Sequence, residues 1–275
     1  MQAIERQLLA NPDDSAAWLV YADALLERGD PRGDVIALGE QLRRGDSSVA
    51  ARYAERCRAA RWPREAPFPR MHYRVRFEQM FAELRVRPDV EIRVASIDDP
   101  LDDLETWKRA AGAAWPAGMT ELYTELSGVE LEYRIGEDAS GGIHIPSLSL
   151  WDHDALDGEL WFDFTEETSA LHRIRPIDRF ISEAYTVLYL ETPSAPARVA
   201  YHYCGESLVP LGITYREWLE LLFRARGALY WIQLAMGPGG RRTWVEEGIE
   251  HVAKLFPDFD PESIRPASAF PEVDL

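Results

Sequence analysis

The first part of the chain carries hydrophobic side chains at the spacing of short α-helices. Asp14 or Ser15 can cap a helix that ends near Gly29, a residue suited to the left-handed position after a helix. The inward face of this helix is expected to hold Trp18, Tyr21, Ala22, Leu25 and Leu26. Two more helices are expected over 34–42 and 47–61, because Pro63 then breaks the pattern. The sequence therefore predicts a helical N-terminal module over 1–62.

Between residues 71 and 95 the hydrophobic spacing changes to an alternation of period two. Tyr73, Val75 and Phe77 alternate with charged residues. The later alternating positions are Leu84, Val86, Val90, Ile92 and Val94. Such alternation is typical of half-buried strands. We therefore expect a β connector over 63–95, which either forms a small bridging sheet or extends the edge of the sheet that follows.

Residues 96–256 show strand-like and helix-like segments in an α+β order. Helices are expected after Asp99 and Pro116, and a longer helix begins at Thr214, where Glu217 completes a capping box. Strands are expected over 131–135, 142–150, 159–164, 185–190 and 198–204. A second capping box at Thr243 opens the last helix. Residues 257–275 are rich in proline and are expected to form a loosely held tail.

Three short elements mark the N-terminal module: Tyr21-Ala22-Asp23, Gly29-Asp30 and Arg32-Gly33. Over about residues 1–45 the chain resembles the repeat-companion domain found at the N-termini of many bacterial paralogous families. That family has no established activity, so the resemblance implies none. The two aspartates are expected to cap helices or to pair with neighbouring arginines.

A second resemblance covers about residues 98–232. Its opening elements are Leu104-Glu105, Gly112, Trp115-Pro116, Leu122-Tyr123 and Leu126-Ser127-Gly128. Its closing elements are the strand over 198–204 and the aromatic-rich helix over 211–222. This order resembles the SUKH superfamily. The resemblance implies a SUKH-like α+β sheet with packed helices, and a non-enzymatic role as an immunity protein that neutralises secreted bacterial toxins, often nucleases.

Charge separates the two parts of the chain. The net charge is −17, from 30 basic and 47 acidic side chains, which excludes a typical nucleic-acid-binding protein. Residues 1–95 hold 16 basic and 15 acidic side chains, whereas residues 96–275 hold 14 and 32. The stretch 43–76 contains ten arginines and three acids. It is expected to be a solvated helix face or to dock onto the acidic part of the same chain.

The sequence offers no convincing catalytic or cofactor site. It lacks a P-loop, an HExxH motif and a nucleophile elbow. Asp152-His153-Asp154, with His144 and His172 elsewhere, comes closest to a metal-ligand set, but three contiguous residues of a strand point to alternate faces. His202 and Cys204 share one strand face, where ordinary sheet packing is expected. We therefore predict no enzyme activity, no metal and no cofactor.

The most informative stretch runs from Trp151 to Glu167. It combines seven acidic residues with four aromatic residues and contains no lysine or arginine. An acidic, aromatic surface suits capture of a cationic protein, because charge speeds association and aromatic rings anchor the contact. The predicted partner-binding residues are Asp152, Asp154, Asp157, Glu159, Trp161, Glu166 and Glu167. The alternative is a surface that only keeps the protein soluble, with Trp161 in the core.

These observations favour an immunity-type binding protein. Its partner is expected to be a basic toxin domain, possibly a nuclease, whose surface it occludes. The N-terminus has no secretory pattern and no apolar run is long enough to span a bilayer, so the expected location is the cytoplasm, without membrane or nucleic-acid partners. The alternative hypothesis is an interaction or scaffold protein in a regulatory complex.

Overall fold

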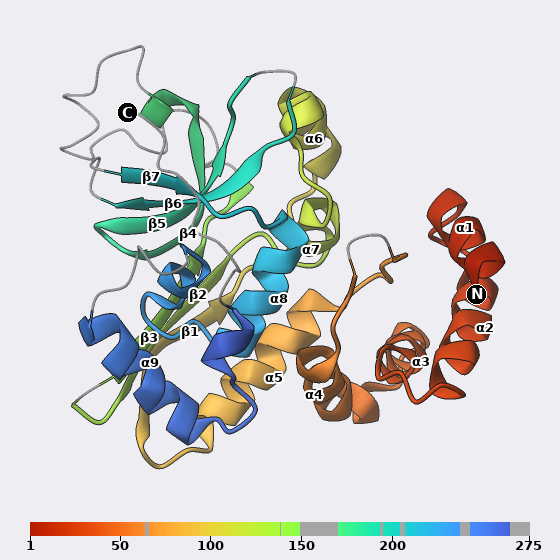
Figure 1. The fold of residues 1–275 in the computed structure, drawn as a ribbon, viewed down its shortest axis with the longest axis horizontal. Coiled ribbons are helices and arrows are strands. Elements are labelled where there is room, and N and C mark those ends of the chain that lie inside the picture. The colour runs from red at the N-terminus through yellow and green to blue at the C-terminus, as the bar shows by residue number, and fades with distance from the viewer. Residues whose placement is uncertain are drawn as a thin grey trace. The chain divides into compact units, whose positions relative to one another are not determined.

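The computed structural model describes residues 1–63, 66–137, 139–148, 170–192, 195–203, 207–236 and 243–264 (Figure 1). The chain forms two compact units, Met1–Glu83 and Leu84–Leu275. Helices come first and two antiparallel sheets with packed helices follow, which confirms the predicted α+β class. Every helix in these ranges is too short or too polar to span a lipid bilayer.

The first unit is built from helices, three of which lie close to the ranges predicted from the sequence. They are α1 (Gln2–Ala10), α2 (Ser15–Leu26), α3 (Arg32–Arg43), the short 3₁₀ helix η1 (Ser47–Val49), α4 (Ala50–Ala59) and most of α5 (Tyr73–Arg85). Asp14 caps α2 by accepting a hydrogen bond from the backbone N–H of Ala17 at 3.0 Å. Gly29 follows with a φ of 71°, the left-handed conformation predicted for it.

The core of this unit forms around α2. Its buried residues are Leu8, Ala17, Trp18, Tyr21, Ala22, Leu25 and Ile36. Leu26 was predicted to face inward, but it is 41% exposed. It is the last residue of α2 and lies about 100° around the helix from Leu25, outside the buried face.

Helix α5 contradicts the predicted strands over 73–77 and 84–86. Tyr73 and Phe77 are four residues apart, a spacing that places two side chains on one face of a helix as well as of a strand. Buried Met80, Phe81 and Leu84 continue the helical spacing instead of the alternation. The predicted β connector over 63–95 is therefore wrong for residues 73–85 and correct for the strand that begins at residue 90.

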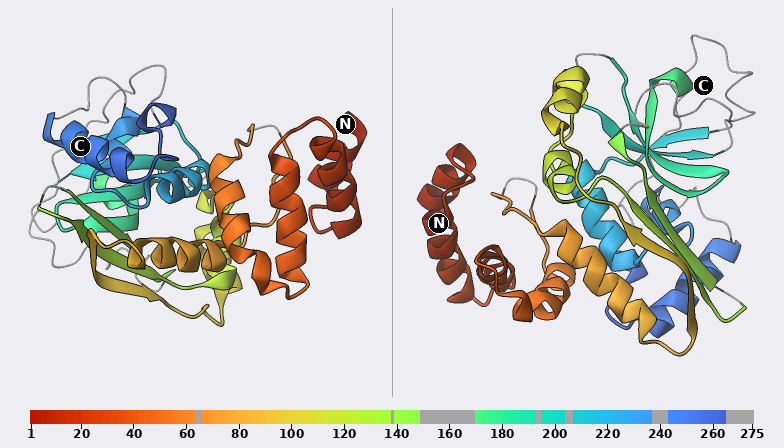
Figure 2. Two further views of the ribbon diagram at one scale, coloured as in Figure 1. Left: turned by 90° about the horizontal axis from the view of Figure 1, so that it is seen from below. Right: turned by 180° about the vertical axis from the view of Figure 1, so that it is seen from behind.

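That strand belongs to a three-stranded antiparallel sheet, here called sheet A. Its strands are β1 (Val90–Ile97), β2 (Val129–Ile135) and β3 (Ala139–Ile145), in the order β1-β2-β3. Figure 2 shows these yellow-to-green strands lying side by side. The predicted strand over 90–94 thus joins the sheet that follows, which was one of the two alternatives. Along β2, buried and exposed residues alternate strictly, so one face of the sheet packs inward.

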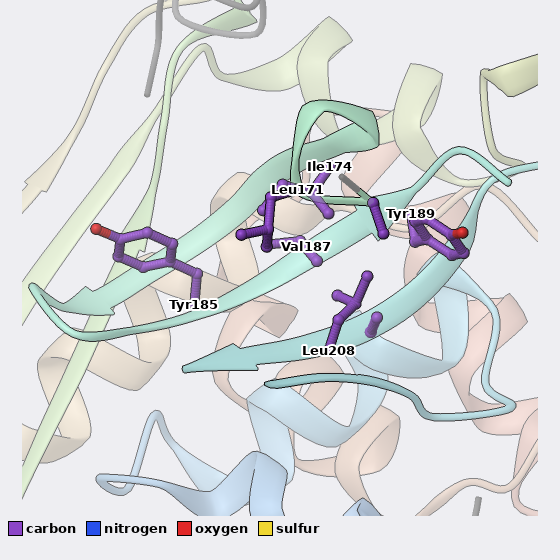
Figure 3. Packing of buried hydrophobic residues seen from close by; sticks show 8 residues of the cluster. Leu171, Ile174, Tyr185, Val187, Tyr189 and Leu208 are labelled. Carbon is purple, nitrogen blue, oxygen red and sulfur yellow. The ribbon is translucent and has the colours of Figure 1, made fainter. Parts of the chain in front are cut away.

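The second sheet, sheet B, has four antiparallel strands in sequence order. They are β4 (Ile174–Ile181), β5 (Ala184–Tyr189), β6 (Arg198–Tyr203) and β7 (Ser207–Pro210). Strand β5 is buried on both faces. On one face Val187 packs with Leu171 of the 3₁₀ helix η5 (Ala170–Arg173) and with Ile174, between the rings of Tyr185 and Tyr189 (Figure 3). Of these strands, β4 and β7 were not predicted.

Helices complete the second unit. They are α6 (Leu104–Ala111), α7 (Met119–Glu125), α8 (Tyr215–Ala225) and α9 (Thr243–Leu255), with 3₁₀ helices η2 (Gly112–Ala114), η6 (Trp231–Met236) and η7 (Pro261–Ser263). The predicted capping box opens α8: Thr214 Oγ1 accepts from the N–H of Glu217 at 3.1 Å, and Glu217 Oε2 accepts from the N–H of Thr214 at 2.7 Å. Leu122 and Leu222 are fully buried, as expected of core positions.

Two helix-related predictions need correction. Helix α6 begins at Leu104 with Asp103 at its N-cap, so Asp99 does not start it. The predicted loose tail begins with residues that are fixed in the fold, because Phe259 and Ile264 are buried. Residues 265–275 lie outside the described part of the chain.

Candidate functional site

The predicted partner-binding residues lie outside the described residues. This holds for all seven of them: Asp152, Asp154, Asp157, Glu159, Trp161, Glu166 and Glu167. Their role stays a prediction. A candidate site must therefore be built from the polar and charged groups that the structure does place, and most of these belong to the second unit.

Sheets A and B meet at strands β3 and β4. Asp178 of β4 accepts a hydrogen bond through Oδ1 from the backbone N–H of His144 in β3, at 2.8 Å. Register shifts in the pairing with β5 lie on either side of Asp178. Such irregularities redirect side chains, and here the carboxylate reaches the edge of the neighbouring sheet. Asp178 thus pairs a backbone N–H at the edge of sheet A.

The environment of Asp178 changes its acidity. The residue is fully buried, and its second oxygen, Oδ2, has no hydrogen-bond partner among the described residues. Burial raises the pKa of Asp178 to about 7, because desolvation penalises the charged form more than the His144 hydrogen bond favours it. This carboxyl group therefore gains and loses a proton near neutral pH.

Asp178 begins a row of polar groups that crosses sheet B. Thr186 of β5 lies opposite Asp178, and Tyr201 of β6 lies opposite Thr186. The Gln233 amide donates to the Tyr201 hydroxyl at 2.8 Å. All four residues are buried, so this row is closed to solvent and to a substrate in this conformation. Its arrangement supports a structural role between packed strands.

The rest of the β3 edge is covered by the loop that follows α8. The N–H of Gly142 donates to the Gly227 carbonyl at 2.8 Å, and the N–H of Leu229 donates to the Ser140 carbonyl at 2.9 Å. The Tyr133 hydroxyl donates to the Arg226 carbonyl at 3.0 Å, which fixes the start of this loop. Because these backbone groups are already paired, a partner cannot add a strand at this edge.

Exposed acids gather where sheet A ends. Strand β1 runs into the segment 98–105, which has no lysine or arginine. Across the strands, Glu130 of β2 lies opposite Ser96 of β1 and His144 of β3. We call the following exposed residues the acidic corner: Asp98, Asp99, Asp102, Asp103, Glu105 and Glu130. Sequence reasoning assigned Asp99 to helix capping and so missed this surface, although the acidic run was visible.

The pKa of His144 is affected by both positive and negative charges near the acidic corner. Burial lowers the pKa of His144 most, and the positive charge of Arg179 acts in the same direction. The negative charges of Glu130 and Asp98 act against both. The acids therefore lie close enough to His144 to influence its ring, which places Asp98 and Glu130 in one neighbourhood.

Of the other residues singled out by sequence, the structure describes His144, His172 and His202. His202 is fully buried and packs its ring against Tyr185, with 6.0 Å between ring centroids. Cys204 lies outside the described residues. Among the residues that the structure places, His144 and His172 included, no three potential ligands converge on a metal site.

Searches against family models, curated proteins and solved structures found no match to this chain. The resemblances to the repeat-companion domain and to the SUKH superfamily therefore rest on the residues that carry them.

Proposed function

We propose that the second unit is a non-catalytic binding domain that captures a cationic protein. The observation that carries this proposal is the distribution of charge. Residues 84–275 contain 34 acidic and 17 basic side chains, whereas residues 1–83 contain 13 of each. The whole excess of negative charge thus belongs to the unit that holds the acidic corner.

The proposal includes the predicted acidic window over 151–167 as a second part of the binding surface. The chain leaves β3 at Ile145, the residue opposite Val129, which is itself opposite the last residue of β1. The acidic corner and the described chain that leads toward the window therefore belong to the same end of sheet A. An acidic surface attracts a basic partner over about one Debye length, near 8 Å at physiological salt.

Together with the SUKH resemblance, this charge favours an immunity protein that neutralises a toxin by occluding its basic surface. A nuclease toxin must present positive charge to its nucleic acid, and an acidic domain competes for that surface without any reaction. Capture needs no catalytic residue, only fast association and a stable contact.

The test starts from a partner identified by affinity capture from the source organism and purified separately. In the variant carrying Asp102→Lys and Asp103→Lys, we expect association measured by stopped flow to slow about tenfold at low salt, since exposed charges act mainly on the association rate. The dependence of that rate on salt should become weaker. The matched control carries Glu247→Lys and Glu250→Lys, two exposed acids of α9, and gives the same change in net charge.

Equal slowing by both pairs would show that net charge alone matters and would remove the acidic corner from the proposal. The biological role has its own test, in which the captured protein is produced in cells with and without this chain. Rescue of growth is the expected result. Binding without any toxicity of the partner would instead favour the scaffold alternative.

A further inference from the structure

The helical unit contains a pocket that the proposed function does not use. Its volume is about 140 Å³. All of its lining residues belong to the first unit: Pro12, Asp13, Ser15, Trp18, Val35, Ile36, Gly39, Glu40, Arg43, Pro69, Arg70 and His72. They come from the turn between α1 and α2, from α2 and α3, and from the segment before α5.

The inner wall of the pocket is apolar and fixed. Trp18, Val35 and Ile36 are buried. The Trp18 indole donates its N–H to the Pro12 carbonyl at 2.7 Å, so its polar atom is already paired and the ring is held in place. Gly39 has no side chain and leaves this wall open. An apolar cavity of about 150 Å³ accepts a molecule the size of benzene, so this pocket has room for one aromatic ring.

The rim of the pocket carries two arginines in different states. Arg43 is bound by Glu40, whose carboxylate accepts from its Nη2 at 2.5 Å and from its Nε at 3.2 Å. Arg70 is exposed, and no hydrogen bond or ion pair joins it to the other described residues. Arg70 is thus an exposed cation at the rim of a pocket whose inner wall is apolar, available to a carboxylate.

His72 lies beside these arginines and adds a polar contact. Its Nε2 is 3.0 Å from the Gly39 carbonyl oxygen, which only accepts, so Nε2 carries the ring proton and Nδ1 is an acceptor. Burial is the main cause that lowers the pKa of His72, and the charges of Arg70 and Arg43 lower it further. Both guanidinium groups therefore lie close enough to His72 to act on its ring.

We propose that this pocket docks a peptide segment of a protein partner that presents one aromatic side chain followed directly by a carboxylate. The ring fills the apolar cavity and the carboxylate contacts Arg70. The cavity holds no more than the ring, so the rest of the segment lies over the rim, where a peptide backbone can donate to His72. Asp13, in the turn between α1 and α2, also lines the pocket and repels a carboxylate, which favours its contact with Arg70.

The experiment titrates the isotope-labelled full chain with the acetylated, amidated peptide Gly-Phe-Glu-Gly and follows the indole N–H of Trp18 by NMR. The Trp18→Phe variant assigns that signal. We expect a saturable shift of the Trp18 signal. Peptides with Ala in place of Phe, or Lys in place of Glu, should bind at least about fivefold more weakly, the loss that follows from about 1 kcal/mol of contact energy.

Two protein variants separate the site from general electrostatics. Arg70→Glu should weaken binding by about fivefold or more, because it reverses the contact charge. Arg52→Glu changes the same charge on an exposed residue of α4 that does not line the pocket, and it should change the affinity by less than about twofold.

The proposal fails if the Trp18 signal does not shift on titration, or if the Ala peptide binds as well as the Phe peptide. Equal weakening by Arg70→Glu and Arg52→Glu would also overturn it, since the binding would then depend on net charge. None of these outcomes bears on the acidic corner, which belongs to the other unit.

Discussion

The two units differ in how far apart in sequence their longest polar contacts lie. In the helical unit, local pairs such as Arg43 with Glu40 occur beside contacts between segments, such as that of His72 with the Gly39 carbonyl, which spans 33 residues. In the sheet-containing unit, the hydrogen bond from Tyr133 to Arg226 spans 93 residues.

The difference follows from the way each kind of backbone is paired. A helix satisfies its own peptide groups within four residues, so charged side chains can stay at the surface. A strand leaves an edge that a distant segment must cover, and that segment brings polar groups into the interior. Among the described residues, eight buried residues are polar or charged: Arg76 from the helical unit, and Ser127, Asp178, Thr186, His202, Glu220, Arg226 and Gln233 from the other.

Replacing a glycine should give the largest difference in stability loss between the two units. At Gly141 of β3, a methyl group would overlap the ring of Tyr133, whose hydroxyl helps to fix the Arg226 loop. We expect Gly141→Ala to lower the free energy of unfolding by about 3 kcal/mol. Gly39→Ala in α3 is the matched control, because its nearest contact is the Tyr53 ring at 3.4 Å. It should be neutral or stabilising by up to about 1 kcal/mol in urea unfolding. Equal effects would contradict this contrast.

Removal of a single charge partner should have a smaller effect, again confined to the sheet-containing unit. The Arg226 side chain is 3% exposed and contacts both oxygens of Asp258. Asp258→Ala leaves a buried guanidinium without its carboxylate and should cost about 1 to 3 kcal/mol. The control, Arg56→Ala, removes the pair with Asp34, in which both side chains are 43% exposed, and should leave the melting temperature unchanged. A similar drop in both variants would show that burial does not decide the cost.

The last expected effect concerns pH. Burial raises the pKa of Asp178 to about 7, so the folded state favours the protonated form. Its contribution to stability is complete below the ordinary pKa near 4 and is lost as the pH rises through 7. The free energy of unfolding should therefore fall by up to about 1.4 kcal/mol per pH unit between pH 5 and 7 from this group. In Asp178→Asn that part of the slope should disappear, as measured by urea unfolding at pH 5, 6, 7 and 8.

A carboxylate of the helical unit gives the opposite sign and serves as the control. The hydrogen bond from Arg32 lowers the pKa of Asp30, so its stabilisation is present above pH 4 and is lost as the pH falls. Asp30→Asn should therefore leave the slope between pH 5 and 7 unchanged. An unchanged slope in Asp178→Asn would mean that Asp178 does not titrate in this range.

Local signals in the sequence predicted the helices well where a cap was present. Asp14 before α2 and Thr214 before α8 act within three residues, and both helices begin where these caps indicate. Helix α5 lacked such a signal. Its first hydrophobic residues, Tyr73 and Phe77, fit both periods, and the buried Arg76 between them removed the expected contrast between an inner and an outer face.

The candidate sites depended on the structure to different degrees. The acidic run of residues 98–105 could have been noticed from the sequence, but its exposure beside Glu130 depends on the pairing of β2 with its neighbours. Strand β4 was missed because Pro176 and charged residues interrupt its hydrophobic pattern. Without β4, neither the burial of Asp178 nor its contact with His144 could be foreseen.

The sequence by itself determined the α+β class, the helical N-terminal module, the capped helices and the acidic charge of the larger part. These features depend on composition or on residues within about four positions of each other. Only the tertiary structure decided which strands pair, which segment covers the β3 edge, where Asp178 is buried and where the helical unit leaves a pocket. Those features join residues far apart in sequence, and the free energy of each contact exists only once both partners have been brought together.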